Sequence, residues 1–534
     1  MRFLEKLVLF VALVVVFIAL ICADLATAAP DCNGLLHARI HKGSITDTLI
    51  VSATGSSPEY CKVTGKLYPE VGFELRLPTT GWNKKLLHVG GGGLCGSIPT
   101  NSGNDALNRG YAVVGTDAGH SPYVPLPGGG DDGSWAYDNP QGEVDFAYRA
   151  VHIVTVAAKQ LVKEFYGRGP KYSYFRGCST GGRQALMEAH QFAGDFEGII
   201  AGDPHPYFAG YSVVLDGWYD TVNYDAALGQ NTLTTDKVEV LRKAVYSTCD
   251  DIDGLKDSVI DDPRRCDFDA ASITCTAGMD PSTCLTAQQV EVVKKLYDGP
   301  KDSRGRYVWF GGLGKGSENV WPNVYVANSG LSIMGKMAQE MLRYMMFRKD
   351  PGPSYSLFDF NYDTDLRRLK RASELYNPVS YGHLQEFKRH GGKLLMYTGW
   401  ADPHNALSTV HYYQEMSKIY GEKRIKEWFR FFPVPGMNHC SGGPGPNRFD
   451  MLTALENWVE NNVAPDRIIA SGGTAAPSAG RTRPLCPYPL VARYTGNGST
   501  DAAENFACVK PDYTIPTYPW EHMRFPWEGA RSMK

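Results

Sequence analysis

Short apolar runs alternate with a longer amphipathic stretch in the N-terminal half of the chain. Each short run is bounded by turn residues, as is typical of β-strands. The longer stretch has apolar residues at helical spacing and is followed by Gly167, a residue type that commonly ends helices. This alternation is typical of a mostly parallel sheet covered by helices on both faces. The pattern predicts strands at residues 73–77, 86–89, 111–114 and 198–201 and a helix at residues 144–166.

The alternation breaks down in the middle of the chain. Between about residues 204 and 380 the periodicity is irregular, aromatic residues are frequent and four cysteines cluster. Strand-like runs return at residues 393–397 and 428–432, followed by a helical run at 448–463. We therefore expect an α/β protein with a large inserted lid domain. The expected division is a main domain of residues 29–203 and 381–534 and a lid domain of residues 204–380.

The first residues have the features of a secretory signal peptide. Basic residues precede an apolar run at residues 7–22, and Ala26-Thr27-Ala28 offers a small-residue cleavage site. We expect residues 1–28 to be removed and the protein to be secreted, or periplasmic in a Gram-negative bacterium. A retained anchor is the alternative, because the run is only slightly short of a spanning helix. A lipoprotein attached through Cys22 fits less well, because Ile21 is bulky.

The charge of the chain argues against charged macromolecular partners. The 534 residues carry a formal net charge of −3. A protein that binds nucleic acid or an anionic membrane surface is usually strongly basic. No stretch beyond the signal is apolar enough to span a bilayer. We therefore expect neither a nucleic acid nor, after signal removal, a membrane as partner.

The cysteine content predicts disulfides. Of the twelve cysteines, Cys22 leaves with the signal and eleven remain. In an exported protein most of these are expected to be bridged. Cys95, Cys178 and Cys440 have no partner nearby in the sequence, and the odd total requires one free thiol or an intermolecular bond. Proximity in the sequence suggests the pairs Cys32–Cys61, Cys249–Cys266, Cys275–Cys284 and Cys486–Cys508.

A glycine-rich turn carries the first candidate catalytic residue. The run Gly177-Cys-Ser-Thr-Gly181 fits the pattern Gly-x-Ser-x-Gly, and it lies between a strand-like run and a helical run. A serine on such a turn exposes its hydroxyl at the edge of a sheet, and the glycines allow the neighbouring backbone to pack closely. Ser179 is therefore a candidate nucleophile of an α/β-hydrolase. A glycine-rich turn before an ordinary helix is the alternative.

A serine nucleophile needs a base and an orienting acid, which follow it in the order Asp, His in α/β-hydrolases. Asp402 follows the strand expected at residues 393–397, and His439 follows the strand expected at 428–432. We expect His439 to transfer the proton and Asp402 to hold the imidazole. The position in the sequence leaves alternatives open. They are Asp203 and Asp117 for the acid and His88, His120, His205 and His404 for the base.

Two cysteines flank these candidates. Cys178 directly precedes Ser179, and Cys440 directly follows His439. Bridged Cα atoms lie about 4.4–6.8 Å apart, and each neighbour adds at most about 3.8 Å. A Cys178–Cys440 bond therefore holds the Cα atoms of Ser179 and His439 within about 14 Å, which is compatible with a hydrogen bond between their side chains. This pairing leaves only Cys95 without a partner.

Further motifs accompany the Cys-Ser, Asp and His-Cys arrangement. They are Cys61-Lys-Val-Thr-Gly, Gly72-Phe-Glu, Trp82-Asn, Gly110-Tyr-Ala-Val-Val and Pro435-Gly-Met-Asn-His-Cys-Ser-Gly-Gly. In this arrangement and these motifs the chain resembles the tannase and feruloyl esterase family, which also includes the mono(2-hydroxyethyl) terephthalate hydrolases. The resemblance implies a secreted α/β-hydrolase with a lid, a calcium ion in the lid, and hydrolysis of esters of aromatic acids. Cys95 is a departure, because some fungal members have a further pairing near it.

An acidic loop at residues 249–259 is the candidate calcium site. It contains four aspartates around a glycine, and calcium binds six to eight oxygen ligands. The spacing is not that of an EF-hand, and a solvated acidic turn is the alternative. We expect a structural ion, in a loop that the Cys249–Cys266 pair would close. The family resemblance assigns as ligands the side chains of Asp250, Asp253 and Asp257 and the carbonyl groups of Leu255 and Val259.

An oxyanion hole requires two backbone N–H groups directed at the developing negative charge. Thr180, which follows the candidate nucleophile, is expected to supply one. The Gly90–Gly93 run is expected to supply the other, at Gly92 or Gly93, because glycine permits close approach of the backbone. A phosphate-binding loop is the alternative, but no Gly-Lys-Ser/Thr pattern accompanies these glycines.

We therefore expect a serine carboxylic-ester hydrolase that cleaves feruloyl, other hydroxycinnamoyl or galloyl esters through an acyl-enzyme. Its substrate would be a small aromatic ester, or a plant polyphenol or cell-wall ester. Hydrolysis of terephthalate-type half-esters or other small aromatic esters is the alternative, and a catalytically silent, calcium-stabilised binding protein is a third hypothesis. The candidates for the acyl pocket are Trp309, Trp321 and Trp400, and the cations available for a half-ester are Arg343 and Arg348.

Overall fold

The computed structural model describes most of the chain. The described residues are 31–122, 124–126, 129–381, 384–404, 406–473, 477–516, 518 and 525–526. The predicted signal peptide, residues 1–28, lies outside the described residues. Among the helices of the described part, none is both long and apolar enough to cross a membrane.

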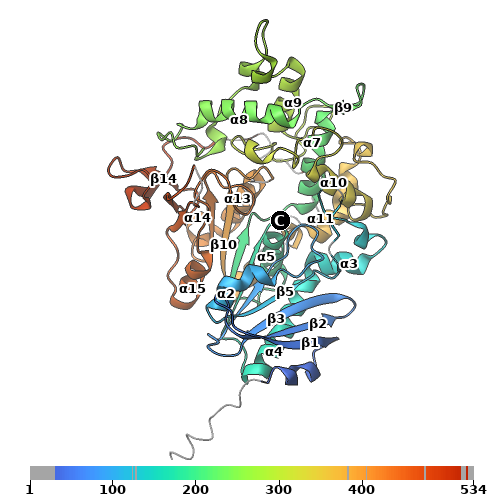
Figure 1. The fold of residues 1–534 in the computed structure, drawn as a ribbon, viewed down its shortest axis with the longest axis vertical. Helices are drawn as coiled ribbons and strands as arrows, with labels where there is room; N and C mark the ends of the chain where they lie inside the picture. Colours follow the sequence, from blue (N-terminus) through green and yellow to red (C-terminus); the bar gives the residue numbers. More distant parts are fainter. Residues whose placement is uncertain are drawn as a thin grey trace, which may run out of the picture.

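A nine-stranded sheet forms the centre of the molecule (Figure 1). Its strand order is β1-β2-β3-β5-β4-β6-β7-β10-β11. The pairings from β1 to β5 are antiparallel, and those from β5 to β11 are parallel. The mostly parallel sheet expected from the sequence is thus present, with an antiparallel edge. The strands are β1 (Gly43–Val51), β2 (Tyr60–Leu67), β3 (Val71–Pro78), β4 (Lys85–Val89), β5 (Ala112–Thr116), β6 (Tyr172–Cys178), β7 (Gly198–Gly202), β10 (Lys393–Gly399) and β11 (Phe429–Val434).

Helices cover both faces of the sheet. Successive side chains of a strand point to opposite faces, so neighbouring residues of one strand pack against different helices. In β4, Leu86 packs in the core with α4, whereas Leu87 packs in the core with α2 and α15. Helix α5 packs on β6 and β7, and α13 packs on β10. The helices are α2 (Asn104–Asn108), α3 (Pro140–Val144), α4 (Ala150–Tyr166), α5 (Thr180–Gln191), α13 (Ala406–Tyr420), α14 (Glu422–Ile425) and α15 (Met451–Asn461).

The observed helices differ from the predicted ones mainly at their N-terminal ends. The helix predicted from residue 144 begins with a π-helical turn, Asp145–Arg149, and becomes α4 at Ala150. It ends as expected at Gly167, whose φ of 72° is left-handed. The predicted 448–463 helix is the shorter α15, because the side chain of Asp450 caps its first turn.

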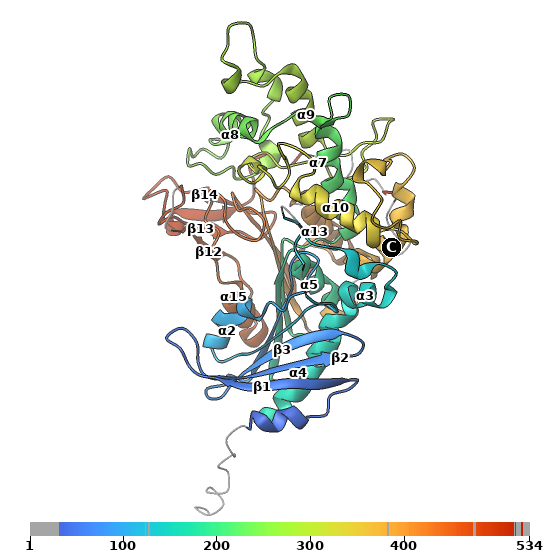
Figure 2. The ribbon, with the colours of Figure 1, turned by 45° about the vertical axis from the view of Figure 1, so that its right-hand side comes forward.

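Among the described residues, those between β7 and β10 add no strand to the nine-stranded sheet. They form helices and one short hairpin above the sheet (Figures 1 and 2). Their buried side chains, such as Trp309 and Trp321, belong to a core that also includes Met396 of β10. The predicted lid, residues 204–380, lies within this segment, which we call the insertion. Its elements are α6 (Phe208–Gly210), α7 (Asp216–Asn223), β8 (Tyr224–Asp225), β9 (Gln230–Asn231), α8 (Thr235–Cys249), α9 (Ala287–Asp298), α10 (Ile333–Tyr344), α11 (Lys370–Tyr376) and α12 (Gln385–Arg389).

The C-terminal part of the chain forms two hairpins beside the sheet (Figure 2). The guanidinium group of Arg493 donates to the carbonyl oxygen of Asp253 at 2.9 Å, so this part of the chain is fastened to the acidic loop of the insertion. The hairpins are β12 (Ile468–Ser471) with β13 (Thr482–Leu485) and β14 (Val491–Tyr494) with β15 (Phe506–Val509).

Candidate active site

Ser179 lies on a sharp turn between strand β6 and helix α5. Its φ of 62° and ψ of −125° are rare for a residue with a side chain. The neighbouring glycines are required by close packing: a Cβ on Gly177 would lie 2.7 Å from the Cα of Gly181, and a Cβ on Gly181 would lie 2.9 Å from the carbonyl oxygen of Gly91. The predicted strand-to-helix turn is therefore present, and its strained residue is the candidate nucleophile.

Asp402 and His439 form a hydrogen-bonded pair. They follow β10 and β11, as the sequence predicts, and the Nδ1 of His439 lies 2.8 Å from the Oδ2 of Asp402. The other carboxylate oxygen of Asp402 accepts the backbone N–H of His404 at 2.9 Å. Asp402 is only 2% exposed. Both oxygens of the buried carboxylate are thus engaged, and one of them orients the imidazole ring.

The charges around this pair shift both pKa values. Burial alone lowers the pKa of His439, but the negative charges of Asp402 and Asp203 outweigh it and raise the pKa to about 9. Burial raises the pKa of Asp402, but the positive charge of His439 and its hydrogen bond outweigh that effect and hold the pKa below its ordinary value. The surroundings therefore stabilise the imidazolium form that His439 takes on when it accepts a proton.

Asp203, an alternative for the acid, has a different position. Its carboxylate accepts hydrogen bonds from a hydroxyl and a backbone N–H of β10 and from a backbone N–H of the loop that carries His439. Burial and the charge of Asp402 raise its pKa to about 7. Asp203 therefore holds this loop against β10, while Asp402 contacts the imidazole. The three donors are Thr398 Oγ1 at 2.9 Å, Gly399 N at 2.8 Å and Cys440 N at 2.8 Å.

The remaining alternatives from the N-terminal half lie in other surroundings. Asp117 accepts backbone N–H groups of Gly72 and Gly119. His88 is fully buried, with its Nδ1 2.8 Å from a threonine hydroxyl of α4. His120 stacks on Trp135. None of these three hydrogen-bonds to Ser179 or His439 in the described part of the chain.

All five predicted disulfides are present. The Cys178–Cys440 bond has a Cα–Cα distance of 5.9 Å and joins positions 262 residues apart in the chain. It therefore connects the turn that carries Ser179 with the loop that carries His439. Cys95 is free and buried, and burial raises the pKa of its thiol to about 12. The other four bonds are Cys32–Cys61, Cys249–Cys266, Cys275–Cys284 and Cys486–Cys508.

The hydroxyl of Ser179 lies beside a second histidine. Its Oγ is 3.5 Å from the Nε2 of His205, a residue that follows β7 and is 1% exposed. The His205 ring is nearly parallel to the His439 ring, with centroids 5.7 Å apart. In the described part of the chain no hydrogen bond joins Ser179 to His439. The only signal for His205 in the sequence is its position after a parallel strand. Its contact with Ser179 could not be predicted, because that contact depends on how β7 packs beside β6.

The loop after β4 approaches the first turn of α5. The hydroxyl of Thr180 donates to the carbonyl oxygen of Gly93 at 2.6 Å. The N–H groups of Gly91 and Leu94 are bonded to the side chains of Gln184 and Asp131. Within the described residues, by contrast, the backbone N–H groups of Thr180, Gly92 and Gly93 have no acceptor. The three predicted oxyanion-hole residues thus retain free donors near Ser179.

A cavity of about 190 Å³ lies on the insertion side of Asp402. Trp309 and Trp400 line it, together with His404 and Tyr297. Trp321 does not line this cavity. It is completely buried, and its indole N–H donates to the hydroxyl of Ser317 at 2.9 Å. Two of the three predicted pocket tryptophans therefore face an open space beside the candidate acid.

The two predicted anion-binding arginines are placed less favourably. Arg343 forms an ion pair with Glu340 at 2.8 Å and donates to the carbonyl oxygen of Tyr355 at 2.9 Å. Arg348 is exposed. Neither arginine lines the cavity beside Asp402.

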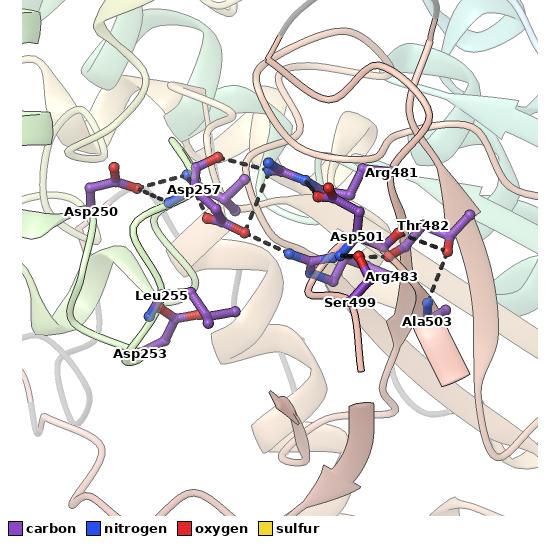
Figure 3. A network of polar contacts seen from close by, with 11 residues as sticks. Asp250, Asp253, Leu255, Asp257, Arg481, Thr482, Arg483, Ser499, Asp501 and Ala503 are labelled. Carbon is purple, nitrogen blue, oxygen red and sulfur yellow. Dashed lines mark hydrogen bonds and ion pairs between the residues drawn. The ribbon is translucent and has the colours of Figure 1, made fainter. Parts of the chain in front are cut away.

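The acidic loop at residues 249–259 is held by backbone N–H groups and by arginines (Figure 3). Asp250 accepts the N–H groups of Asp257 and Val259 at 3.2 and 3.1 Å. In Figure 3 the carboxylate of Asp257 points toward the C-terminal hairpins, where it contacts Arg483 at 2.6 Å and Arg481 at 3.4 Å. The carboxylates of Asp250 and Asp257 are therefore engaged with the protein, whereas Asp251 of the same loop is exposed.

The donor atoms of this loop fit a hard cation. Within the described residues, the carbonyl oxygens of Leu255 and Val259 accept no hydrogen bond. Nearby, the buried Oδ2 of Asp261 also has no partner, and burial together with the charge of Asp253 raises the pKa of Asp261 to about 7. Buried oxygens without donors are costly unless a cation binds them. The loop thus offers oxygen donors of the kind that calcium prefers, although the two arginines share Asp257 and, within the described residues, its carboxylates are not among the groups whose ligand atoms all lie within 4.8 Å of one another.

The fold and this arrangement define an α/β-hydrolase. The family model for tannase and feruloyl esterase matches residues 52–509, and the chain belongs to this family. It is a carboxylic ester hydrolase.

Relatives of known name cover most of the chain. The mono(2-hydroxyethyl) terephthalate hydrolase of Piscinibacter sakaiensis is 33% identical over an alignment of 529 residues, and the match covers 86% of each chain. The probable feruloyl esterase B-1 of Aspergillus oryzae is 28% identical over 475 residues, covering 84% of this chain and 82% of the relative.

Solved structures agree with this assignment. Feruloyl esterase B from Aspergillus oryzae aligns with a TM-score of 0.79 at 26% identity, covering 90% of this chain and 100% of that chain. A tannin acyl hydrolase from Aspergillus niger aligns with a TM-score of 0.71 at 22% identity, covering 91% and 94% of the two chains. The second likeness supports the fold alone.

Proposed function

We propose that this protein is a secreted serine esterase that cleaves esters of aromatic acids, with a feruloyl, other hydroxycinnamoyl or galloyl group as the acid part. The observation that carries the proposal is the Cys178–Cys440 bond, which fastens the strained Ser179 turn to the loop of the Asp402–His439 pair. Membership of the tannase and feruloyl esterase family supports the ester substrate.

The proposed reaction begins with attack of the Ser179 hydroxyl on the ester carbonyl. His439 accepts the hydroxyl proton and later delivers it to the leaving alcohol, while Asp402 stabilises the imidazolium. The N–H groups of Thr180 and of Gly92 or Gly93 donate to the oxyanion. Water then hydrolyses the acyl-enzyme by the same steps in reverse order.

His439 is a better base than His205 in this scheme. Burial lowers the pKa of His205 well below its ordinary value, and the neighbouring His439 lowers it further. His439 instead has a buried carboxylate on its Nδ1. The 3.5 Å contact between Ser179 and His205 is longer than an ordinary hydrogen bond, so it leaves the hydroxyl able to turn toward His439 in the substrate complex.

Calcium, when bound by the acidic loop, would neutralise buried negative charge. Asp250, Asp253 and Asp257 would hold it with the carbonyl groups of Leu255 and Val259. The loop is closed by the Cys249–Cys266 bond and fastened to the C-terminal hairpins by arginines. These contacts support a structural role for the ion.

The cavity beside Asp402 suits an aromatic acid, and because Arg264 and Lys315 are among its lining residues it does not by itself favour a neutral acid over a terephthalate half-ester. The walls contributed by Trp309 and Trp400 suit an aromatic ring, whereas Arg343 is already paired with Glu340. The half-ester remains the second candidate, because a relative with 33% identity is named for that reaction. A silent binding protein is disfavoured by the complete set of catalytic side chains. The five disulfides support export of the protein.

A substrate panel tests the proposal. Methyl ferulate, methyl gallate and a mono(2-hydroxyethyl) terephthalate half-ester are incubated with the calcium-loaded protein and with Ser179→Ala. We expect turnover of at least one methyl ester, with kcat reduced by at least about 10⁴-fold in Ser179→Ala. Exclusive turnover of the half-ester would transfer the assignment to the second candidate. A folded protein that hydrolyses none of the three would contradict the proposed function.

A further inference from the structure

Three histidines gather around the candidate acid. His205, His404 and His439 follow β7, β10 and β11, and they meet at the carboxyl ends of these parallel strands. The His404 and His439 rings cross at 66° with centroids 4.5 Å apart, and the His205 ring lies 6.1 Å from that of His404. A ring nitrogen of His404, a ring nitrogen of His439 and a carboxylate oxygen of Asp402 all lie within 4.8 Å of one another. The serine mechanism uses only one of these three rings.

The ring of His404 is oriented as that of a metal-binding histidine is. Its Nδ1 lies 2.8 Å from the hydroxyl of Tyr211 and 3.7 Å from the Oδ1 of the buried Asp216. Metal-bound histidines almost always have one ring nitrogen held by such an oxygen, which leaves the other, here the Nε2, to bind the ion. The Nδ1 of His439 lies 2.8 Å from Asp402. An ion that binds these two atoms takes the place of the proton between them, which is released to solvent.

The surroundings favour a cation. Asp203, Asp216 and Asp402 are each no more than 3% exposed. The Oδ1 of Asp216 forms no hydrogen bond within the described residues. Buried negative charge that is incompletely paired attracts a positive ion. The negative charge of these aspartates thus strengthens the binding of a cation by the imidazole nitrogens.

The type of donor selects the type of ion. Imidazole with one carboxylate suits zinc, copper or nickel, whereas calcium and magnesium prefer oxygen alone. Two ligands on one zinc ion are at most about 4.2 Å apart, because each bond is about 2.0–2.1 Å long. The three atoms lie no more than 4.8 Å apart, so side-chain shifts of less than about 1 Å bring them to the distances of a zinc site.

We propose that His404, His439 and Asp402 form a binding site for a zinc-like divalent transition metal, with His205 beside it. An ion held there replaces the hydrogen bond between Asp402 and His439 and makes the imidazole a weaker base for the serine proton, so it inhibits ester hydrolysis reversibly. The inhibitory consequence rests on the proposed function, but the binding of the ion does not. The protein would thus have two metal sites of opposite effect, a stabilising calcium loop and an inhibitory histidine site.

Direct binding is measured on Ser179→Ala, calcium-loaded and titrated with zinc chloride by calorimetry. Visible absorption of bound cobalt(II) reports the coordination of the same site. We expect one zinc ion per chain at this site. The affinity for zinc should be at least about 10-fold weaker in Ser179→Ala/His404→Gln and in Ser179→Ala/His439→Gln. The matched control is His152→Gln, which removes a half-buried histidine of α4 that is paired with Asp195. Two variants are used because either alone could destabilise the fold, which thermal melting checks.

Inhibition is measured on the wild type and on His404→Gln with whichever ester is hydrolysed. We expect zinc to reduce the rate in the wild type, a chelator that prefers zinc to calcium to restore it, and the inhibition constant to rise at least about 10-fold in His404→Gln. Equal zinc affinity in the control, His404→Gln and His439→Gln, or no binding at all, would overturn the proposed site. An inactive protein that still binds zinc through these histidines would refute the proposed function and leave the site intact.

Discussion

Buried carboxylates gather at two places in the molecule, and their partners differ. Beside Ser179, the carboxylates of Asp203 and Asp402 lie among histidines, whose side chains can gain and lose a proton. In the acidic loop, Asp257 lies against Arg481 and Arg483, whose charge does not change. The first arrangement can move a proton, whereas the second can only hold charge in place. The same residue type thus serves chemistry in one region and stability in the other.

The two regions are also fastened differently. The Cys178–Cys440 bond connects loops that are 262 residues apart and lies directly beside the candidate catalytic residues. The Cys249–Cys266 bond spans only 17 residues and closes the acidic loop on itself. Changes in the first region should therefore alter the rate of hydrolysis, and changes in the second should alter mainly the free energy of unfolding.

The largest effect is expected from Asp402→Asn. The substitution keeps the size of the side chain but no longer stabilises the imidazolium, and it favours the wrong tautomer of His439. We expect kcat to fall by about 10⁴-fold, with little change in the melting temperature. Initial rates on the best ester of the panel and a thermal melt check this. A fall of less than tenfold would mean that another group orients the base.

Removal of the Cys178–Cys440 bond should affect both rate and stability. In Cys178→Ser/Cys440→Ser we expect a loss of about 2–5 kcal/mol of unfolding free energy and a lower kcat/KM at temperatures where the protein is folded. The control is Cys486→Ser/Cys508→Ser, a bond of 22-residue separation away from Ser179. It should lose stability and keep its kcat/KM. Equal kcat/KM in the two variants would separate the bridge from catalysis.

Calcium removal should affect stability alone. At a calcium concentration about 100 times its Kd, bound calcium adds about 2.7 kcal/mol to the free energy of unfolding. Chelation should therefore lower the melting temperature of the wild type and leave kcat/KM nearly unchanged below the transition. Asp257→Asn should reduce this calcium-dependent shift, whereas Asp251→Asn, which alters an exposed aspartate of the same loop, should not. A shift of equal size in both variants would contradict the assigned ligands.

The smallest effect concerns the pH dependence of the rate. Neutral His439 is the active form, so kcat/KM should rise with pH as the imidazolium loses its proton, toward the pKa of about 9. Asp203 contributes to this high pKa, so Asp203→Asn should move the rise to lower pH by about one unit. Asp117→Asn changes a buried carboxylate outside the site and should leave the profile in place. A shift to higher pH in Asp203→Asn would contradict the assigned charges.

Positions that follow from topology could be predicted from the sequence, and contacts that depend on packing could not. The placement of Ser179, Asp402 and His439 after strands of the sheet was predictable because each follows a recognisable strand, and the flanking cysteines limited the choice; their catalytic roles stay a prediction. The contact between Ser179 and His205 was not predictable, because it depends on the side-by-side packing of β6 and β7.

Long-range contacts of the fold were missed for a related reason. Nothing in the pattern of residues 481–493 indicates that Arg483 pairs with Asp257, which lies 226 positions earlier in the chain. The antiparallel strand β1 was also not predicted, because it lies at the edge of the sheet, where its side chains are mostly exposed and an apolar run is not required.

Trapping of the acyl-enzyme tests the central claim most directly. The protein is mixed with methyl ferulate or methyl gallate, quenched with acid during turnover, digested and analysed by mass spectrometry. The account predicts an added feruloyl or galloyl group on Ser179, in the peptide joined by disulfide to the one that carries His439, and no adduct in Ser179→Ala. An adduct on another residue, or undiminished turnover in Ser179→Ala, would contradict it.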